Sequence, residues 1–388
     1  MSPRAFAWLV RSTAWLAGIG LLALLLATGV ATRADDALYD LNMRYWTYAP
    51  GDDVVIVAID PKSLDELGRW PFPRSLHARL IERLDAAGVR AIGMDVTMTT
   101  PDAAHPQNDR ALATALRQSG RVVMPVFAEP ADLGGTLQET LPVPALAQGA
   151  VAFGHVDVDQ GMDGITRGAY LTAGLGRAYW PSLALALYRL DHPAKNDAQL
   201  PGLRNPAPGD ASPYLWVRDH YVLLHYAGPA GSPDSFGRVS YADVLDGRVP
   251  TALLKGRVVL VGATAEGMGD IIRTPDGLMP GVEYQANMLE SLRRGNLLVP
   301  LGFTAQFVVG AAMLALPCLL YGLPGLRRVW RTAAVGALLA LAASLFMLRM
   351  LGLWWPPATC VLTFAIALVA WDLLGRRPRH AAPAGSPA

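Results

Sequence analysis

The stretch DDVVIVAIDPKSLDELGRWPFPRSLHARLIERLDAAGVRAIGMD, residues 52–95, decides the fold. Residues 54–59 are all apolar, which predicts a buried strand, and Asp60-Pro61 ends it because proline cannot continue a central strand. Residues 90–94 form a second short strand, closed by Asp95. Between the two strands, apolar residues recur at helical spacing at Leu76, Leu80, Ile81 and Leu84. Strand, crossover helix and strand predict a parallel sheet and an α/β fold.

Two carboxylates, Asp60 and Asp95, directly follow the ends of these strands. In open parallel sheets, ligands bind at the edge formed by the carboxyl ends of the strands. The corner GRWPFPR lies beside Asp60 and adds Arg69, Trp70 and Arg74, so it is a candidate recognition surface. Alternatively, its aromatic rings cover the edge of the sheet, and Arg74 pairs with Asp60 or Asp95 to hold the two loops together.

The composition indicates a membrane protein. The chain has 388 residues, of which 52% are hydrophobic, and its mean hydropathy is +0.27. The formal net charge is +1, so we expect no bulk electrostatic attraction to nucleic acid. The two cysteines, Cys318 and Cys360, both lie in apolar runs near the C-terminus, and the polar part of the chain therefore needs no disulfides.

Four apolar runs predict four transmembrane helices, at residues 14–31, 303–320, 333–348 and 358–374. The first run could be a cleaved signal peptide, but it is longer than a usual signal core and no A-x-A site follows it. By the positive-inside rule, both termini are cytoplasmic and residues 33–300 lie outside, in the periplasm of a bacterium. The arginines that set this direction are Arg4, Arg11, Arg327, Arg328, Arg331, Arg376, Arg377 and Arg379.

The outer segment continues the α/β pattern. Alternating sequences predict two hairpins, which pair residues 151–157 with 165–171 and residues 214–217 with 221–226. The other predicted elements are helices over residues 108–118, 181–189 and 282–294 and strands over residues 122–127 and 258–262.

The turn after residue 155 carries further polar candidates. His155, Asp157 and Asp159 lie on one face of a strand and could bind a metal, but the calcium-loop pattern fails at several positions. A hydrogen-bonded turn formed by Asp163 and Arg167 explains the same residues. We therefore expect no metal and no cofactor.

The glycine-rich loop in VVLVGATAEGMGD, residues 258–270, lacks the Lys-Ser/Thr and the G-x-G-x-x-G spacing of nucleotide-binding loops. It is better explained as a rim loop that ends in Asp270, with Thr274 shortly after it. No nucleophile elbow and no H-E-x-x-H motif occur, and we expect no enzymatic activity. The predicted ligand-binding residues are Asp60, Arg69, Trp70, Arg74, Asp95, Asp163, Arg167, Asp270 and Thr274.

Three stretches together resemble the second variety of the CHASE family (cyclases/histidine kinases associated sensory extracellular domains). They are VVIVAIDPKSLDELGRWPFPR with the helix and AIGMDV strand after it, FGHVDVDQGMDGITR, and GRVVLVGATAEGMGDIIRTPDGLMPGVEYQANMLESL. The likeness covers about residues 35–300, and three membrane spans typically follow this variety. The resemblance implies an α/β domain that senses a ligand and signals through the membrane.

Members of that family usually carry a cytoplasmic output domain after the last span. Here only about fourteen residues follow Leu374, too few to fold into a domain. We therefore expect a separate output protein as partner, besides the membrane and an unidentified periplasmic ligand. Sensor function favours a homodimer, although no heptad pattern supports one.

The expected organisation is a cytoplasmic N-terminus with the first span (residues 1–32), a sensory domain (33–300), three spans (301–375) and a short cytoplasmic tail (376–388). The expected function is an inner-membrane sensor. Two alternatives are an envelope assembly or scaffold protein that binds a periplasmic protein or glycan, and a periplasmic metal-assisted hydrolase.

Overall fold

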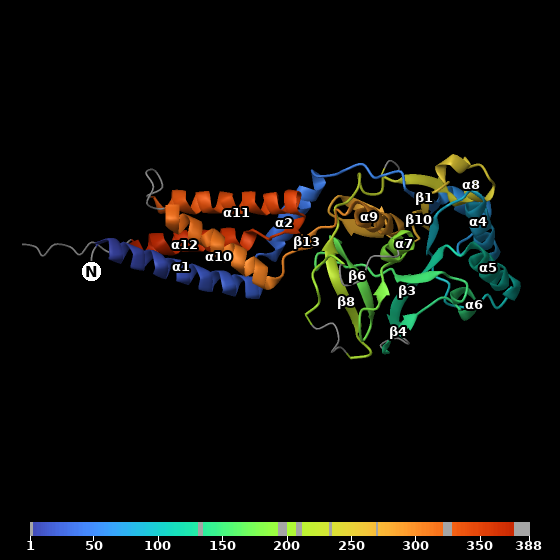
Figure 1. Ribbon diagram of the computed structural model, residues 1–388, viewed down its shortest axis with the longest axis horizontal. Coiled ribbons are helices and arrows are strands. Elements are labelled where there is room, and N and C mark those ends of the chain that lie inside the picture. The colour runs from blue at the N-terminus through green and yellow to red at the C-terminus, as the bar shows by residue number, and fades with distance from the viewer. Residues whose placement is uncertain are drawn as a thin grey trace, which may run out of the picture. The chain divides into compact units, whose positions relative to one another are not determined.

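The computed structural model describes residues 3–130, 135–192, 200–206, 212–232, 235–268, 271–320 and 328–375. The chain divides into two compact units. One is Asp40–Pro300, and the other joins Met1–Tyr39 to Leu301–Ala388. Figure 1 shows the first unit as mixed helices and strands and the second as a group of long helices.

A seven-stranded sheet forms the centre of the Asp40–Pro300 unit, in the order β4-β3-β2-β10-β1-β9, with β5 also paired to β3. Every pair is parallel except β3 with β4, which confirms the predicted α/β fold with a mainly parallel sheet. The strands are β1 (Val54–Ile59), β2 (Ala91–Asp95), β3 (Val122–Pro130), β4 (Leu137–Thr140), β5 (Ala152–His155), β9 (Gly237–Ser240) and β10 (Val258–Ala263).

Helices cover both faces of this sheet, which explains why its central strands are apolar throughout. Val54, Ile56 and Ala58 of β1 enter a core with α7 (Leu183–Asp191) and α9 (Gly281–Arg294). The alternate residues Val55, Val57 and Ile59 enter a second core on the opposite face. The helices of that core are α4 (Arg74–Ala86), α5 (Pro106–Ser119) and α8 (Tyr241–Leu245).

Smaller elements complete the unit. A three-stranded antiparallel sheet has the order β7-β6-β8, and β11 pairs with β12 as a hairpin. These strands are β6 (Gly168–Leu175), β7 (Trp180–Pro181), β8 (Trp216–Leu223), β11 (Ile271–Thr274) and β12 (Gly277–Pro280). The remaining elements are α3 (Pro61–Leu67), α6 (Pro144–Ala147), a 3-10 turn (Thr251–Leu253) and β13 (Val299–Pro300).

Both predicted hairpins are wrong. β5 lies parallel to β3, with Val123 opposite Ala152, instead of turning back onto β6. β8 is one continuous strand that pairs antiparallel with β6, so the expected turn at residues 218–220 lies within it. His220, at the position of the expected turn, has a positive φ of 55°. The alternation correctly indicated strands, but the pairing partners lie elsewhere in the sequence.

The second unit contains α1 (Pro3–Thr28), α10 (Phe303–Leu320), α11 (Val329–Leu351), α12 (Ala358–Gly375) and β14 (Leu353–Trp354), while α2 (Thr32–Arg44) runs from it into the first unit. Among the described residues, one helix is long and apolar enough to span a membrane, Trp330–Leu351. A second span is counted if the bent pair Ser12–Thr28 and Thr32–Arg44 forms one. The apolar helices Phe303–Leu316 and Ala358–Ala367 are shorter. The prediction of four spans is therefore met only in part.

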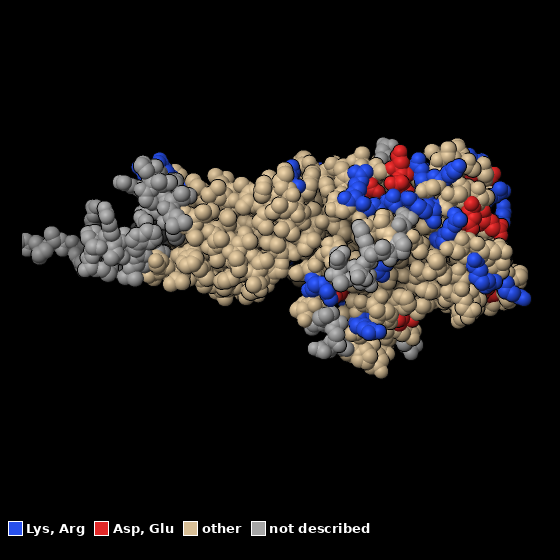
Figure 2. Space-filling view, in the orientation of Figure 1, with Lys and Arg blue, Asp and Glu red and all other residues tan. Residues whose placement is uncertain are grey.

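Close helix contacts hold this unit together. Leu22 of α1 packs against Gly310 of α10, where an added Cβ would lie 2.8 Å from the leucine side chain. Asp35 caps α12 by accepting a hydrogen bond from the Ala358 amide at 2.7 Å. In Figure 2, the visible face of the described helices is nearly free of charged side chains.

Candidate ligand-binding site

A pocket of about 260 Å³ lies at the carboxyl ends of the central strands. Its walls include Ile59 at the end of β1, Asp95 at the end of β2 and Ala263 at the end of β10. The first two turns of α9 close another side with Tyr284 and Gln285. We call this cavity the rim pocket, and it lies at the edge of the sheet where the sequence predicted a ligand.

A glycine in β10 lets α9 approach the sheet closely enough to line the pocket. A Cβ added at Gly262 would lie 2.6 Å from Cβ of Val282 in the first turn of α9, and 3.4 Å from Cβ of Asp95. Any larger residue would push this turn away from the strand ends. The sequence therefore brings the beginning of α9 and the end of β2 to the same cavity.

Polar groups are few in the rim pocket. Asp95 is the charged residue among the described lining residues, which also include the uncharged polar side chains of Thr97 and Gln285. Gln285 is only 2% exposed, and its Oε1 atom has no hydrogen-bond partner among the described residues. Buried polar groups are normally satisfied, so this oxygen is an exception on the buried helix α9.

Aromatic rings supply much of the remaining wall, from Trp70, Phe127 and Tyr284. Trp70 stands edge-on to Phe72 and His77, with ring centroids 5.3 and 5.9 Å apart. Tyr284 donates its hydroxyl hydrogen to the carbonyl oxygen of Gly168 at 3.1 Å, so its ring rather than its hydroxyl group is available to the cavity. Trp70 of the GRWPFPR corner thus both covers the sheet edge and lines the pocket.

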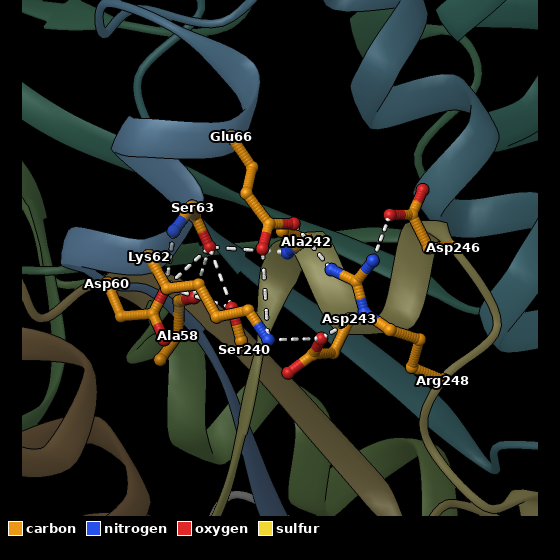
Figure 3. Close-up of polar contacts among 10 residues, drawn as sticks. All are labelled: Ala58, Asp60, Lys62, Ser63, Glu66, Ser240, Ala242, Asp243, Asp246 and Arg248. Atoms are coloured by element: carbon orange, nitrogen blue, oxygen red, sulfur yellow. Dashed lines mark hydrogen bonds and ion pairs between the residues drawn. The ribbon is translucent and has the colours of Figure 1, made fainter.

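Asp60 does not line this pocket. It caps α3, and its Oδ1 accepts hydrogen bonds from the Ser63 amide at 2.8 Å and from the Ser240 hydroxyl at 2.9 Å. Figure 3 shows this cluster, in which Asp60 joins the ends of β1 and β9. Beside it lies an exposed ion-pair network formed by Lys62, Glu66, Asp243, Asp246 and Arg248.

The two arginines of the predicted site are not lining residues either. Arg74 pairs with Asp109 of α5 and donates to the carbonyl oxygen of Thr100, so the alternative in which it pairs with Asp60 or Asp95 is wrong. Asp109 lies nearer because α5 packs alongside α4, where Arg74 begins the helix. Arg69 is exposed.

Asp163 and Arg167 form the expected turn, but as part of a buried ion-pair cluster. Arg167 donates to both carboxylate oxygens of Asp40 at 2.7 Å and to Oδ2 of Asp163 at 2.6 Å. The hydrogen bonds from Arg167 lower the pKa of Asp163 to about 2. Thr274 is buried, and its hydroxyl donates to the carbonyl oxygen of Gly277 at 3.0 Å, within the β11–β12 turn. Asp270 lies outside the described residues.

The candidate metal ligands near residue 155 also have structural partners. Asp157 accepts hydrogen bonds from Trp216 Nε1 at 3.1 Å and Arg218 Nη2 at 2.8 Å. Burial lowers the pKa of His155 to about 4. Within the described parts of the chain, no three His, Cys, Asp or Glu side chains gather closely enough to hold a metal ion.

Of the nine predicted site residues, the structure brings Trp70 and Asp95 to the rim pocket. Sequence reasoning missed Phe127, Tyr284 and Gln285. A signal for the last two existed: the helix over residues 282–294 follows the rim loop, so its first turns had to start near that edge. The alternation of Glu283, Gln285 and Asn287 with apolar residues in this helix was a further sign.

The comparisons with known proteins give one match. The model of the CHASE2 domain family matches residues 16–320, which is more than half of the chain. No curated protein and no solved structure matches it.

Proposed function

The chain belongs to the CHASE2 domain family of extracellular sensory domains, and from this premise we propose that it is a membrane-bound sensor that detects a periplasmic stimulus and relays it to a separate partner. The family assignment supports a sensory role for the Asp40–Pro300 unit. The ligand, the relay and the partner belong to the proposal. No catalytic role is proposed for the polar residues at the strand ends.

The rim pocket is the proposed ligand site. The observation that carries this proposal is the position of this cavity, at the carboxyl edge of a parallel sheet and lined by Asp95, Gln285 and three aromatic residues. The other predicted site residues shape this edge. Asp60 fixes the end of β1, and Arg74 fastens the start of α4 to α5.

α9 is the proposed relay element. It begins at the rim pocket and ends at Arg294, and the chain then leads through β13 to α10. Residues 281–292 of α9 are all buried. Three of its polar side chains hold neighbouring loops: Glu283 accepts from the Gly231 amide, Asn287 from the Ala227 amide and Glu290 from the Gly51 amide.

Because these hydrogen bonds join α9 to its loops, we expect the helix and the loops to shift together. Such coupled movement favours two discrete positions over gradual bending. A ligand can shift such an equilibrium only by its differential affinity for the two positions, typically about 1–3 kcal/mol of coupling.

The proposed topology has four membrane helices, formed by α1, α10, α11 and α12 in an inner bacterial membrane. Residues 33–300 are periplasmic in this proposal. Residues 1–32 comprise the cytoplasmic N-terminus and the first membrane helix, and residues 376–388 form a short cytoplasmic tail. Arg328 and Arg331, which precede or begin α11, would lie in the cytoplasm and face the output partner. A homodimer is compatible with this arrangement.

The test uses the full chain in lipid nanodiscs and a library of small periplasmic solutes. A ligand that binds the folded state raises the melting temperature. Hydrogen exchange is then measured over residues 281–320 with and without each compound that raises it. Altered exchange in both α9 and α10 is expected. Altered exchange at the rim alone would refute the relay, and no stabilising compound would refute small-ligand sensing and favour an envelope scaffold.

A further inference from the structure

We propose that Asp35 is a proton-operated latch: its neutral carboxyl group fastens α2 to the start of α12, and its carboxylate releases α2. The latch would let the chain respond to the pH of the periplasm. This response goes beyond the proposed sensing of a ligand and does not depend on a ligand in the rim pocket. Three observations carry it: the bend between α1 and α2, the contacts of α2, and the surroundings of the carboxyl group.

α2 does not continue the direction of α1. The helices Ser12–Thr28 and Thr32–Arg44 are bent by 79° relative to each other. Gly29, between them, has a positive φ of 62°, which glycine adopts readily, and its carbonyl oxygen accepts a hydrogen bond from Thr32 Oγ1 at 2.8 Å. Because the helix is interrupted at this joint, side-chain contacts must hold α2 in its direction.

Two residues of α2 contact the segment that joins α11 to α12. Asp35 Oδ1 accepts a hydrogen bond from the Ala358 amide at 2.7 Å, and the Tyr39 ring stands edge-on to Trp354, with ring centroids 5.4 Å apart. Asp35 and Tyr39 are four residues apart and therefore share one face of the helix. Of the two contacts, only the one made by Asp35 depends on a carboxyl group, so it is the contact that pH can change.

The carboxyl group of Asp35 is buried without a positive partner. The residue is only 5% exposed, and among the described residues no arginine pairs with it. The last turns of α1, the first turns of α10 and residues 353–361 contain no charged residue. The charged residues on the elements around Asp35 are therefore Arg33, Asp36, Asp40 and Arg44 of α2 and Arg349 of α11.

A carboxyl group in such surroundings keeps its proton up to neutral pH. Burial raises the pKa of Asp35 from its usual 3.8 to about 7; the hydrogen bond from the Ala358 amide lowers this pKa in part, and repulsion by Asp36 raises it. The latched carboxyl group thus binds its proton more tightly than a released one. The stability that the proton gives the latch is complete below about pH 4 and is lost as the pH rises through about 7.

The two protonation states favour different positions of the side chain. A neutral carboxyl group remains buried, and its carbonyl oxygen still accepts a hydrogen bond from the Ala358 amide. A buried carboxylate without a cation is unfavourable, and it reaches water when α2 turns about the joint at residues 29–31. Acid therefore fastens α2 to α12, and alkali releases it.

The test is hydrogen exchange of the full chain in lipid nanodiscs, followed over residues 32–44 and 352–364. It is measured at about pH 5.5 and about pH 8.5, with exchange times scaled for the intrinsic pH dependence of amide exchange. With a pKa of about 7 in the latched state and 3.8 in the released state, the protection of these residues should fall about thirtyfold between the two pH values.

Two variants identify the titrating group. Asp35→Asn matches the protonated state, because its amide oxygen can accept from Ala358 and it carries no charge, so its protection should be the same at both pH values. Asp36→Asn keeps the latch but removes the neighbouring charge that raises the pKa of Asp35. The midpoint of the change in protection should therefore move to a lower pH than in the wild type.

Three outcomes would overturn the proposal. The first is a wild-type protection that stays constant or rises between the two pH values. The second is an equal fall in Asp35→Asn, because another group would then titrate. The third is a midpoint in Asp36→Asn that equals or exceeds the wild-type value, and this comparison decides alone if Asp35→Asn does not accumulate. The solute library tests ligand sensing separately.

Discussion

Arg167 lies in a buried ion-pair cluster whose loss should unfold the Asp40–Pro300 unit at much lower urea concentrations. Its side chain is 9% exposed, and its guanidinium donates to both oxygens of Asp40 at 2.7 Å. Arg167→Met removes the charge but keeps a long apolar stem. Asp40, which is 8% exposed, is then left as a buried carboxylate without its main partner.

Breaking a buried pair from one side costs about 3–5 kcal/mol, because the remaining charge stays desolvated. We therefore expect Arg167→Met to lower the free energy of unfolding by that amount. Replacing both partners removes the uncompensated charge, so the double variant Arg167→Met with Asp40→Leu should recover most of the loss. The matched control is Arg248→Met. Arg248 contacts three carboxylates, but its side chain is 44% exposed, and its loss should matter far less.

The assay is urea denaturation of the full chain in detergent, followed by tryptophan fluorescence, with the slope and midpoint compared between variants. Two results would refute the reasoning. One is an Arg167→Met variant no less stable than Arg248→Met. The other is a double variant no more stable than Arg167→Met, which would mean that the arginine stem or the hydrogen-bond geometry, rather than the unpaired charge, accounts for the loss.

Two further predictions concern pH and packing. Burial lowers the pKa of His77 to about 4, so its neutral form stabilises the folded unit above pH 6.5, and this contribution is lost as the pH falls toward 4. As the pH is lowered, the urea midpoint should fall less steeply in His77→Phe than in the wild type. An equally steep fall in both proteins would contradict this role of His77. A Cβ added at Gly154 would lie 2.5 Å from Cα of Leu183, so Gly154→Ala should melt many degrees lower or fail to accumulate. Gly237→Ala, whose nearest contact would be 3.7 Å, should melt near the wild type, and equal effects would argue against the clash.

The parallel sheet could be predicted because its signals are local. The apolar run of β1, the proline after Asp60 and the helical spacing of residues 76–84 each lie within a few residues of one another. The edge of the sheet that holds the pocket followed from topology alone. The predicted hairpins are wrong because strand pairing is not local. β6 and β8 pair although β7 and α7 lie between them in the sequence, and neither strand's own sequence indicates its partner.

The site residues were harder to predict because a polar side chain takes the nearest suitable partner. Asp60 is satisfied by its own helix and by Ser240, and Arg74 by Asp109, before any ligand is considered. Gln285 was missed for the opposite reason. Its side-chain oxygen is buried without a hydrogen-bond partner among the described residues, and this is visible only when the surrounding side chains are placed.

The central strands of the sheet come from opposite ends of the Asp40–Pro300 unit: Val54 of β1 lies opposite Val258 of β10, and β10 separates β1 from β2. Roughly two hundred residues must therefore be synthesised after β1 before its partner strand β10 is complete. Pairing between strands so far apart in the sequence forms slowly. Until then, β1 and β2 carry unpaired apolar edges that other chains can bind. A nascent chain that stops before residue 258 lacks the strand that joins β1 to β2, so we expect it to expose both strand edges.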